Sequence, residues 1–157
     1  MTQPDKAAQY AQAARDIRAV LDGEPDRTAR MATVASMLTQ AFEHYFWAGF
    51  YVVDPERPGE LVVGPYQGTL GCLRITFGRG VCGTAAAEKQ TVIVEDVHAF
   101  DGHIACDSRS NSEIVVPVLD GAGELIAVFD VDSTEFAAFD EADRAGLEGI
   151  MTEIFGG

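Results

Sequence analysis

The sequence predicts an α+β fold, in which a mainly antiparallel central sheet is flanked by helices near the N- and C-terminal ends of the chain. Two observations on patterning support this class. Apolar residues recur at helical spacing near both ends, and short apolar runs separated by glycine- and proline-containing turns fill the middle. A third observation concerns size, because the 157 residues contain neither an internal repeat nor a long linker. We therefore expect a single domain over residues 1–157.

Helices are expected in four places. The first spans roughly residues 5–22, and the second begins after Asp26, a residue type that caps helix N-termini well. A short alanine-rich helix is expected within residues 78–90. Asp140, followed three residues later by Asp143, is predicted to cap a final helix at the end of the chain.

Strands are expected where β-branched and aromatic residues cluster between turn residues. The segments are FWAGFYVVD (46–54), ELVVGPYQG (60–68), TVIVEDV (91–97), EIVVPVL (113–119) and ELIAVFDVD (124–132). The last two are joined by DGAG and should form a hairpin. Residues 98–111 form a long polar stretch, and loops of this length often carry function.

The charge balance excludes several classes of partner. The formal net charge is −14 at pH 7, so we expect no binding to nucleic acid or to anionic membranes. No run approaches the roughly 20 apolar residues that a membrane-spanning helix needs. The first residues lack the basic and apolar regions of a secretory signal, and an odd number of cysteines does not suit a secreted disulfide framework. These features predict a cytoplasmic protein.

The hairpin gathers three carboxylates on one face of the expected sheet. If residues 120–123 form the turn, Glu113 lies directly opposite Asp130, and Asp132 lies two residues further along the same face. Their expected companions on that face are Val115, Pro117, Ile126 and Val128. The other face holds Ile114, Val116, Val118, Leu125, Ala127, Phe129 and Val131, all apolar, which supports the register.

Like charges opposite one another destabilise a sheet, and no lysine or arginine occurs between Ser110 and Asp143 to compensate. Three explanations remain open. The acids are solvated at the rim of the sheet, or one of them is protonated and suited to donate a proton near neutral pH. In the third explanation a cation satisfies them, namely an ammonium group, a metal ion or a remote arginine. The candidate arginines are Arg74, Arg79 and Arg109.

The three cysteines, Cys72, Cys82 and Cys106, do not match a common zinc site. His98 and His103 supply further ligand types, but no C-x-x-C pair is present, and we expect no metal site and no cofactor. Cys82, between Val81 and Gly83, suits burial as a small apolar side chain. Cys106 does not, because it lies in the polar loop.

A reactive role for Cys106 meets an electrostatic difficulty, since Asp107 and Glu113 disfavour the thiolate form. Two solutions are open. Either His103 or Arg109 turns toward the thiol, or an acid activates the substrate so that less thiolate suffices.

Five segments resemble the free methionine-(R)-sulfoxide reductases, a family of stand-alone GAF-domain enzymes. They are WAGFY (47–51), QGTLGCLRI (67–75), GRGVCGTAA (78–86), VEDVHAF (94–100) and HIACDSRSNSEIVVPV (103–118). The match runs from about Trp47 to Ser133, and the cysteines fit the family pattern C-x9-C-x23-C. Gly71 and Arg109 are small departures that touch no chemical group.

The resemblance implies a role for each matching residue. Cys106 corresponds to the nucleophile, Cys72 to the principal resolving cysteine, and Cys82 to a third cysteine that takes part in later exchange. Trp47 and Tyr51 correspond to aromatic walls of the substrate pocket. Glu113, Asp130 and Asp132 correspond to the acidic cluster that holds the amino acid and assists proton transfer, and we expect Glu113 to be the proton donor.

The implied activity is reduction of free L-methionine-(R)-sulfoxide through a sulfenic acid and an intramolecular disulfide, with thioredoxin as reductant. Related enzymes are commonly dimers, so a homodimer is among the expected assemblies. The alternative is a GAF module that binds a small molecule or senses redox state without catalysis. The expected absence of an output domain after the last helix, and an acidic pocket that opposes anionic nucleotides, favour the enzyme.

Overall fold

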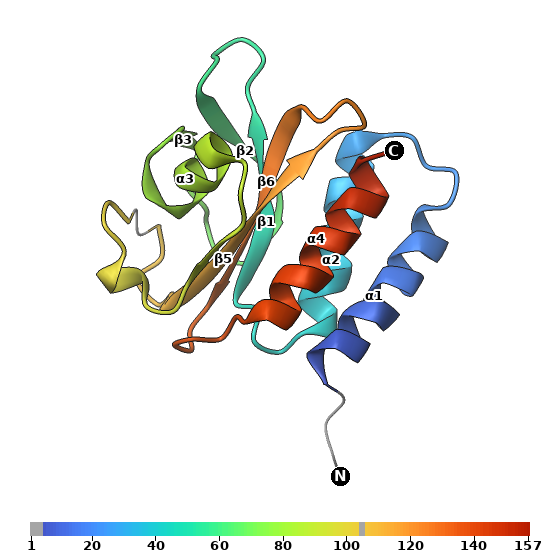
Figure 1. Cartoon of the computed structure of the whole chain (residues 1–157), viewed down its shortest axis with the longest axis horizontal. Coiled ribbons are helices and arrows are strands. Elements are labelled where there is room, and N and C mark those ends of the chain that lie inside the picture. Colours follow the sequence, from blue (N-terminus) through green and yellow to red (C-terminus); the bar gives the residue numbers. More distant parts are fainter. Residues whose placement is uncertain (1–4, 104–105) are drawn as a thin grey trace.

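The computed structural model describes residues 5–103 and 106–157. Its centre is a six-stranded sheet in the order β3-β2-β1-β6-β5-β4, in which every neighbouring pair is antiparallel (Figure 1). The strands are β1 (Trp47–Val53), β2 (Glu60–Gln67), β3 (Arg74–Thr76), β4 (Val92–Val94), β5 (Ser112–Leu119) and β6 (Leu125–Ser133). The expected α+β class with a mainly antiparallel central sheet is confirmed.

Helices cover both faces of this sheet. α2 (Arg27–Ala41) and α4 (Glu141–Phe155) pack on one face, and α1 (Lys6–Leu21) lies against both of them (Figure 1). α3 (Gly80–Glu88) lies on the opposite face, against β5 and β6. A short 3₁₀ helix, η1 (Val97–Ala99), begins the polar loop. No helix in the described part of the chain is both long and apolar enough to span a membrane.

The helix N-termini follow the expected local chemistry. The side chain of Asp26 accepts a hydrogen bond from the Ala29 amide at the start of α2. At the start of α4, Asp140 accepts from the amides of Ala142 and Asp143, and the Asp143 side chain accepts from the Asp140 amide. This reciprocal capping box confirms the predicted start of the last helix.

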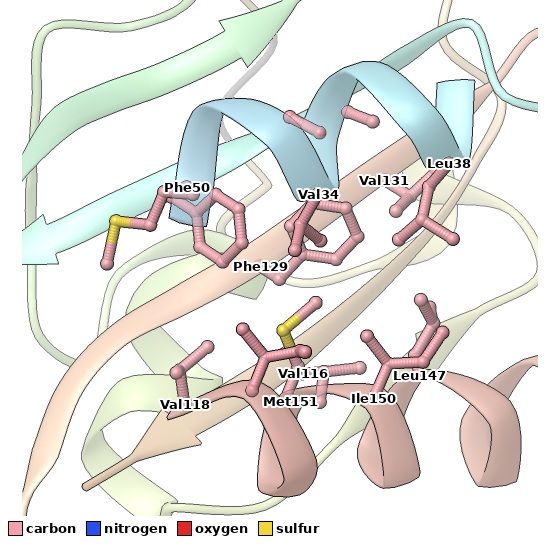
Figure 2. Packing of buried hydrophobic residues seen from close by; sticks show 14 of the residues in the cluster. Val34, Leu38, Phe50, Val116, Val118, Phe129, Val131, Leu147, Ile150 and Met151 are labelled. Carbon is pink, nitrogen blue, oxygen red and sulfur yellow. The ribbon is translucent and has the colours of Figure 1, made fainter. Parts of the chain in front are cut away.

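The larger core lies between the sheet and the layer of α2 and α4. Figure 2 shows apolar side chains of both helices in contact with the same face of β1, β5 and β6. The labelled residues are Val34, Leu38, Phe50, Val116, Val118, Phe129, Val131, Leu147, Ile150 and Met151. A second, smaller core lies between the opposite face of the sheet and α3, and the candidate site is built beside it.

The register of the hairpin differs from the predicted one by two residues. Glu113 lies opposite Asp132, not Asp130. One residue of this difference is already present beside the turn, where Leu119 pairs with Leu125 and not with Glu124, and the second arises where the pairing shifts between Val118 and Leu119. Leu119 pairs with Leu125 but Val118 pairs with Ala127, which leaves Ile126 as an extra residue on β6. A shift by two preserves the alternation of faces, so all three acids still share one face.

The bulge also exchanges two apolar residues between the two cores on opposite faces of the sheet. Ile126 joins Ala127 in the larger core, whereas Leu125 packs against the smaller one, the reverse of the prediction. The short strand β3 was not predicted at all. It contains three residues and pairs with β2 through Leu61 and Ile75, too short a run to show alternation in the sequence.

Candidate active site

One cavity brings together every predicted site residue. It opens on the sheet face that carries α3, and measures about 560 Å³ including its solvent-exposed mouth. The predicted residues that line it are Trp47, Tyr51, Cys72, Cys82, Cys106, Glu113, Asp130 and Asp132. These side chains come from three strands, the first turn of α3 and two loops, so the cavity exists only once the sheet has formed.

The strand register places the side chains in a row across the sheet. Trp47 on β1 lies opposite Asp132 on β6, which lies opposite Glu113 on β5. Asp130 is the next residue on that face of β6, and its partner on β1 is Gly49. Antiparallel pairing therefore sets two acids and an aromatic ring side by side, with the third acid adjacent.

Burial dominates the electrostatics of the three acids. Glu113 and Asp130 are each only 5% exposed, so the solvated-rim explanation is wrong. Burial raises the pKa of all three carboxyl groups, and the charges of Asp130 and Asp132 raise the pKa of Glu113 further. Within the described chain, Oδ1 of Asp130 is buried without a hydrogen-bond partner. This oxygen is a hydrogen-bond acceptor that a donor on a bound ligand can satisfy.

The remote arginines do not neutralise this cluster. Arg74 pairs with Asp54 and Arg109 with Asp107, and no arginine or lysine ion pair reaches the acids among the residues that the structure describes. Arg79 lines the same cavity. The imidazole Nε2 of His103 lies 3.7 Å from Oε1 of Glu113, and burial lowers the pKa of His103.

The three cysteines occupy two distinct environments. Cys72 and Cys106 form a disulfide with a Cα–Cα distance of 5.6 Å, within the range that such bonds require. Cys106 is exposed on its loop, whereas Cys82 is 5% exposed in the first turn of α3. Burial, followed by the charges of Asp130 and Glu113, raises the pKa of the Cys82 thiol. Cys82 is thus the buried thiol that the sequence predicted.

Three donor atoms beside the cavity lie close enough together to contact one cation. Cys82, Glu113 and Asp130 each offer one donor atom, and these atoms lie within 4.8 Å of one another. Of the histidines and cysteines considered from the sequence, four line the cavity, namely Cys72, Cys82, His103 and Cys106, whereas Nε2 of His98 contacts Oδ1 of Asn111 at 3.0 Å. An ammonium group, which donates hydrogen bonds to carboxylates, matches the cluster chemically.

The aromatic wall is held by the loop that carries Cys72. The Trp47 indole stacks on Tyr51, with ring centroids 5.8 Å apart, and its Nε1 donates to the Thr69 carbonyl at 2.7 Å. Two glycines allow the loop to lie this close. Gly68 has φ +128°, and a Cβ on Gly71 would lie 2.8 Å from Cζ2 of Trp47.

Sequence reasoning missed several residues of the cavity wall. Leu70 and Ser110 line it, and Thr69 supports it through the hydrogen bond from Trp47. The available signal was proximity in sequence, because each of these residues lies within four positions of Cys72 or Cys106. Proximity alone does not show which loop residues point inward.

The fold and this site define a GAF domain, whose family model matches residues 26–154. A free methionine-R-sulfoxide reductase of Escherichia coli (strain K12) is 43% identical over 150 residues, covering 96% of this chain and 88% of the relative. A second reductase of that name, from Saccharomyces cerevisiae, is 40% identical over 85% of this chain and 76% of its own length. The chain belongs to the free methionine-R-sulfoxide reductase family.

Solved structures agree with this membership. The free methionine-R-sulfoxide reductase of Neisseria meningitidis, in complex with its substrate, is 46% identical and superimposes with a TM-score of 0.91 over 98% of this chain and 90% of that one. The reduced form of the fRMsr of Staphylococcus aureus is 37% identical, with a TM-score of 0.86 over 99% and 97% of the two chains. The described fold is therefore shared with these proteins.

Proposed function

We propose that this protein reduces free L-methionine-(R)-sulfoxide to L-methionine, with Cys106 as the nucleophile. The observation that carries the proposal is the joining of Cys72 and Cys106 at the mouth of a cavity that also contains the three buried acids. A thiol that attacks sulfur must lie beside the bound substrate and later reach a second thiol. The position of Cys106 on an exposed loop at the cavity supports both requirements.

The acids provide the basis for choosing a free amino acid. Asp130 and Asp132 accept hydrogen bonds from the substrate ammonium, a group that methionine inside a peptide chain lacks. The unpartnered Oδ1 of Asp130 supports this assignment, because a buried carboxylate oxygen gains most from a charged donor. Trp47 and Tyr51 contact the apolar part of the substrate.

Glu113 is the proton donor in this proposal. Its pKa is raised by burial and by its acidic neighbours, which favours the protonated form that a proton donor needs. Cys106 attacks the sulfoxide sulfur while Glu113 protonates the sulfoxide oxygen. The attack forms a bond between the Cys106 sulfur and the substrate sulfur. That bond and the S–O bond of the substrate then break, a bond between the oxygen and the Cys106 sulfur forms, and methionine leaves with Cys106 as a sulfenic acid.

Cys72 completes the cycle as the resolving thiol. Its thiolate attacks the Cys106 sulfur, an S–S bond forms, the S–O bond breaks and water leaves. A dithiol protein of the thioredoxin type then reduces the disulfide by thiol exchange. Cys82 takes part only in later exchange, which its burial beneath the cavity supports. We place this cycle in the cytoplasm, and we propose a homodimer as the assembly.

A coupled assay tests the proposal directly. Reduced enzyme, thioredoxin, thioredoxin reductase and NADPH receive the R and S epimers of free methionine sulfoxide in separate reactions. We expect NADPH consumption with the R epimer, its loss in Cys106→Ser, and little turnover of an N-acetylated substrate. A protein that binds the sulfoxide but consumes no NADPH, even with excess dithiol, would instead be a sensor module.

A further inference from the structure

Two loops that are far apart in sequence meet at the disulfide. Besides the bond between Cys72 and Cys106, one side-chain hydrogen bond joins them among the described residues. The Thr69 hydroxyl donates to Oδ2 of Asp107 at 2.7 Å. Thr69 precedes Cys72 by three residues and Asp107 follows Cys106 directly, so this hydrogen bond joins the two loops close to the positions of the two cysteines.

The Thr69 end of this contact is fixed by the wall of the cavity. The Thr69 carbonyl accepts from Nε1 of Trp47 at 2.7 Å, and Trp47 itself is only 5% exposed. The ring also stacks on Tyr66, with centroids 5.0 Å apart. The buried Trp47 therefore holds the Thr69 backbone in place independently of the contact between the Thr69 hydroxyl and Asp107.

The Asp107 end is fixed by Arg109. The Asp107 carboxylate accepts from the Arg109 amide at 3.0 Å and from its guanidinium Nε and Nη2 at 3.1 and 2.7 Å. The guanidinium in turn lies 4.9 Å from the centroid of the Phe46 ring. These hydrogen bonds from Arg109 hold the pKa of Asp107 well below its usual range, so the acceptor stays ionised.

We propose that Thr69 and Asp107 are positioning residues for the step in which the Cys72–Cys106 disulfide forms. This inference rests on the proposed function and goes beyond it, because neither side chain attacks sulfur or moves the reacting proton. Once Cys106 carries the sulfenic acid, its long loop must bring that sulfur to Cys72. A hydrogen bond between the loops confines the search and raises the effective concentration of one thiol at the other.

The step balances without an added oxidant. The Cys72 thiolate attacks the Cys106 sulfur, the S–S bond forms, the S–O bond breaks, and the released hydroxide takes a proton to become water. The oxidising equivalent comes from the sulfoxide of the preceding half-reaction. The contact between Thr69 and Asp107 thus acts after methionine has been formed, which separates its effect in time from that of the acids.

Single-turnover kinetics test this assignment. Fully reduced enzyme is mixed with methionine sulfoxide without any reductant, and the rates of methionine formation and of disulfide formation are measured separately. In Thr69→Val, which keeps the shape but removes the hydroxyl, we expect disulfide formation to slow about tenfold or more relative to methionine formation. Sulfenic acid should then accumulate on Cys106, where dimedone traps it. Thr69→Ser should restore the ratio of the two rates.

The chain offers a matched control in Thr91. Its hydroxyl also donates to a carboxylate, that of Glu148, but on α4, remote from the disulfide. Thr91→Val should leave the ratio of the two rates at the wild-type value, which separates positioning from a general loss of stability. Asp107→Ala should slow disulfide formation as Thr69→Val does, and the double variant should be no slower than either single one.

The outcomes distinguish the two proposals. Disulfide formation in Thr69→Val at the wild-type ratio would overturn the positioning role. An equal slowing of both rates would overturn it too, since the hydroxyl would then act through the Trp47 wall. Failure of the wild-type enzyme to form methionine would instead refute the proposed function.

Discussion

Asp132 lies between Trp47 and Glu113, its direct cross-strand partners on β1 and β5. This arrangement puts a carboxylate against an aromatic ring on one side and a second carboxyl group on the other. Neither neighbour supplies a positive charge. Burial of these acids without a positive partner is unfavourable, and a cationic ligand would offset that cost. Replacing any one of them should therefore change substrate binding or catalysis measurably.

Glu113→Gln should lower kcat about a hundredfold or more with a smaller effect on KM, because glutamine keeps the shape but donates no proton. The pH dependence provides a second reading. The pKa of Glu113 is raised, so wild-type kcat should fall as pH rises through that pKa. This descending limb should be missing from the variant. A variant with an unchanged kcat would assign the proton to another group.

Asp130→Asn and Asp132→Asn should instead raise KM, by roughly 10- to 100-fold, because each loses a charged partner for the substrate ammonium. N-acetyl methionine sulfoxide serves as the matched probe, since it lacks that ammonium. The wild-type enzyme should strongly prefer the free amino acid, and each variant should lose much of this preference. Equal loss of activity toward both substrates would argue against ammonium recognition.

The buried position of Cys82 predicts the outcome of a disulfide map. After one turnover without reductant, peptide mass spectrometry should recover Cys72 linked to Cys106 and Cys82 as a free thiol, because burial raises the pKa of Cys82 and disfavours its thiolate. Cys72→Ser should leave Cys106 as sulfenic acid. A bridge from Cys82 to Cys106 in the wild-type protein would reverse the resolving assignment.

Asp143 should contribute strongly to stability, through contacts far from the cavity. Its side chain is fully buried and accepts hydrogen bonds from Lys6, His44 and Tyr10. Replacing it by alanine should cost about 3 kcal/mol in the free energy of unfolding, since these partners are left unpaired. Urea denaturation at pH 7 measures this loss, with the exposed Asp22→Ala as a control.

The pH dependence of that stability has a defined sign. Burial alone would raise the pKa of Asp143, but the hydrogen bonds from His44, Lys6 and Tyr10 outweigh it and hold the pKa well below its usual range. The stabilisation is therefore complete above the unfolded pKa of about 3.9 and declines as the pH falls toward the folded value. Asp143→Ala should lose this part of the acid sensitivity. An unchanged slope below pH 5 would contradict the assignment.

Local chemistry explains which elements were predictable. Asp26 and Asp140 begin helices because their own side chains satisfy nearby amides, an interaction that a few residues of sequence encode. The hairpin register was predicted two residues away from its observed pairing, because the sequence indicates neither that Leu119 pairs with Leu125 after the turn nor that Ile126 is the extra residue of a bulge. The assignment of the three acids to one face of the sheet was still correct, because the alternation repeats every two residues.

The sequence by itself determined the fold class and the shared face of the three acids, and by family resemblance it indicated eight residues that the structure places around one cavity. Only the tertiary structure decided that Glu113 and Asp130 are shielded from water and that Thr69 reaches Asp107. Periodicity records which way a side chain points from its own strand or helix. Burial and loop contacts depend on what other segments place over it, and those segments meet only when the whole sheet has closed around the cavity.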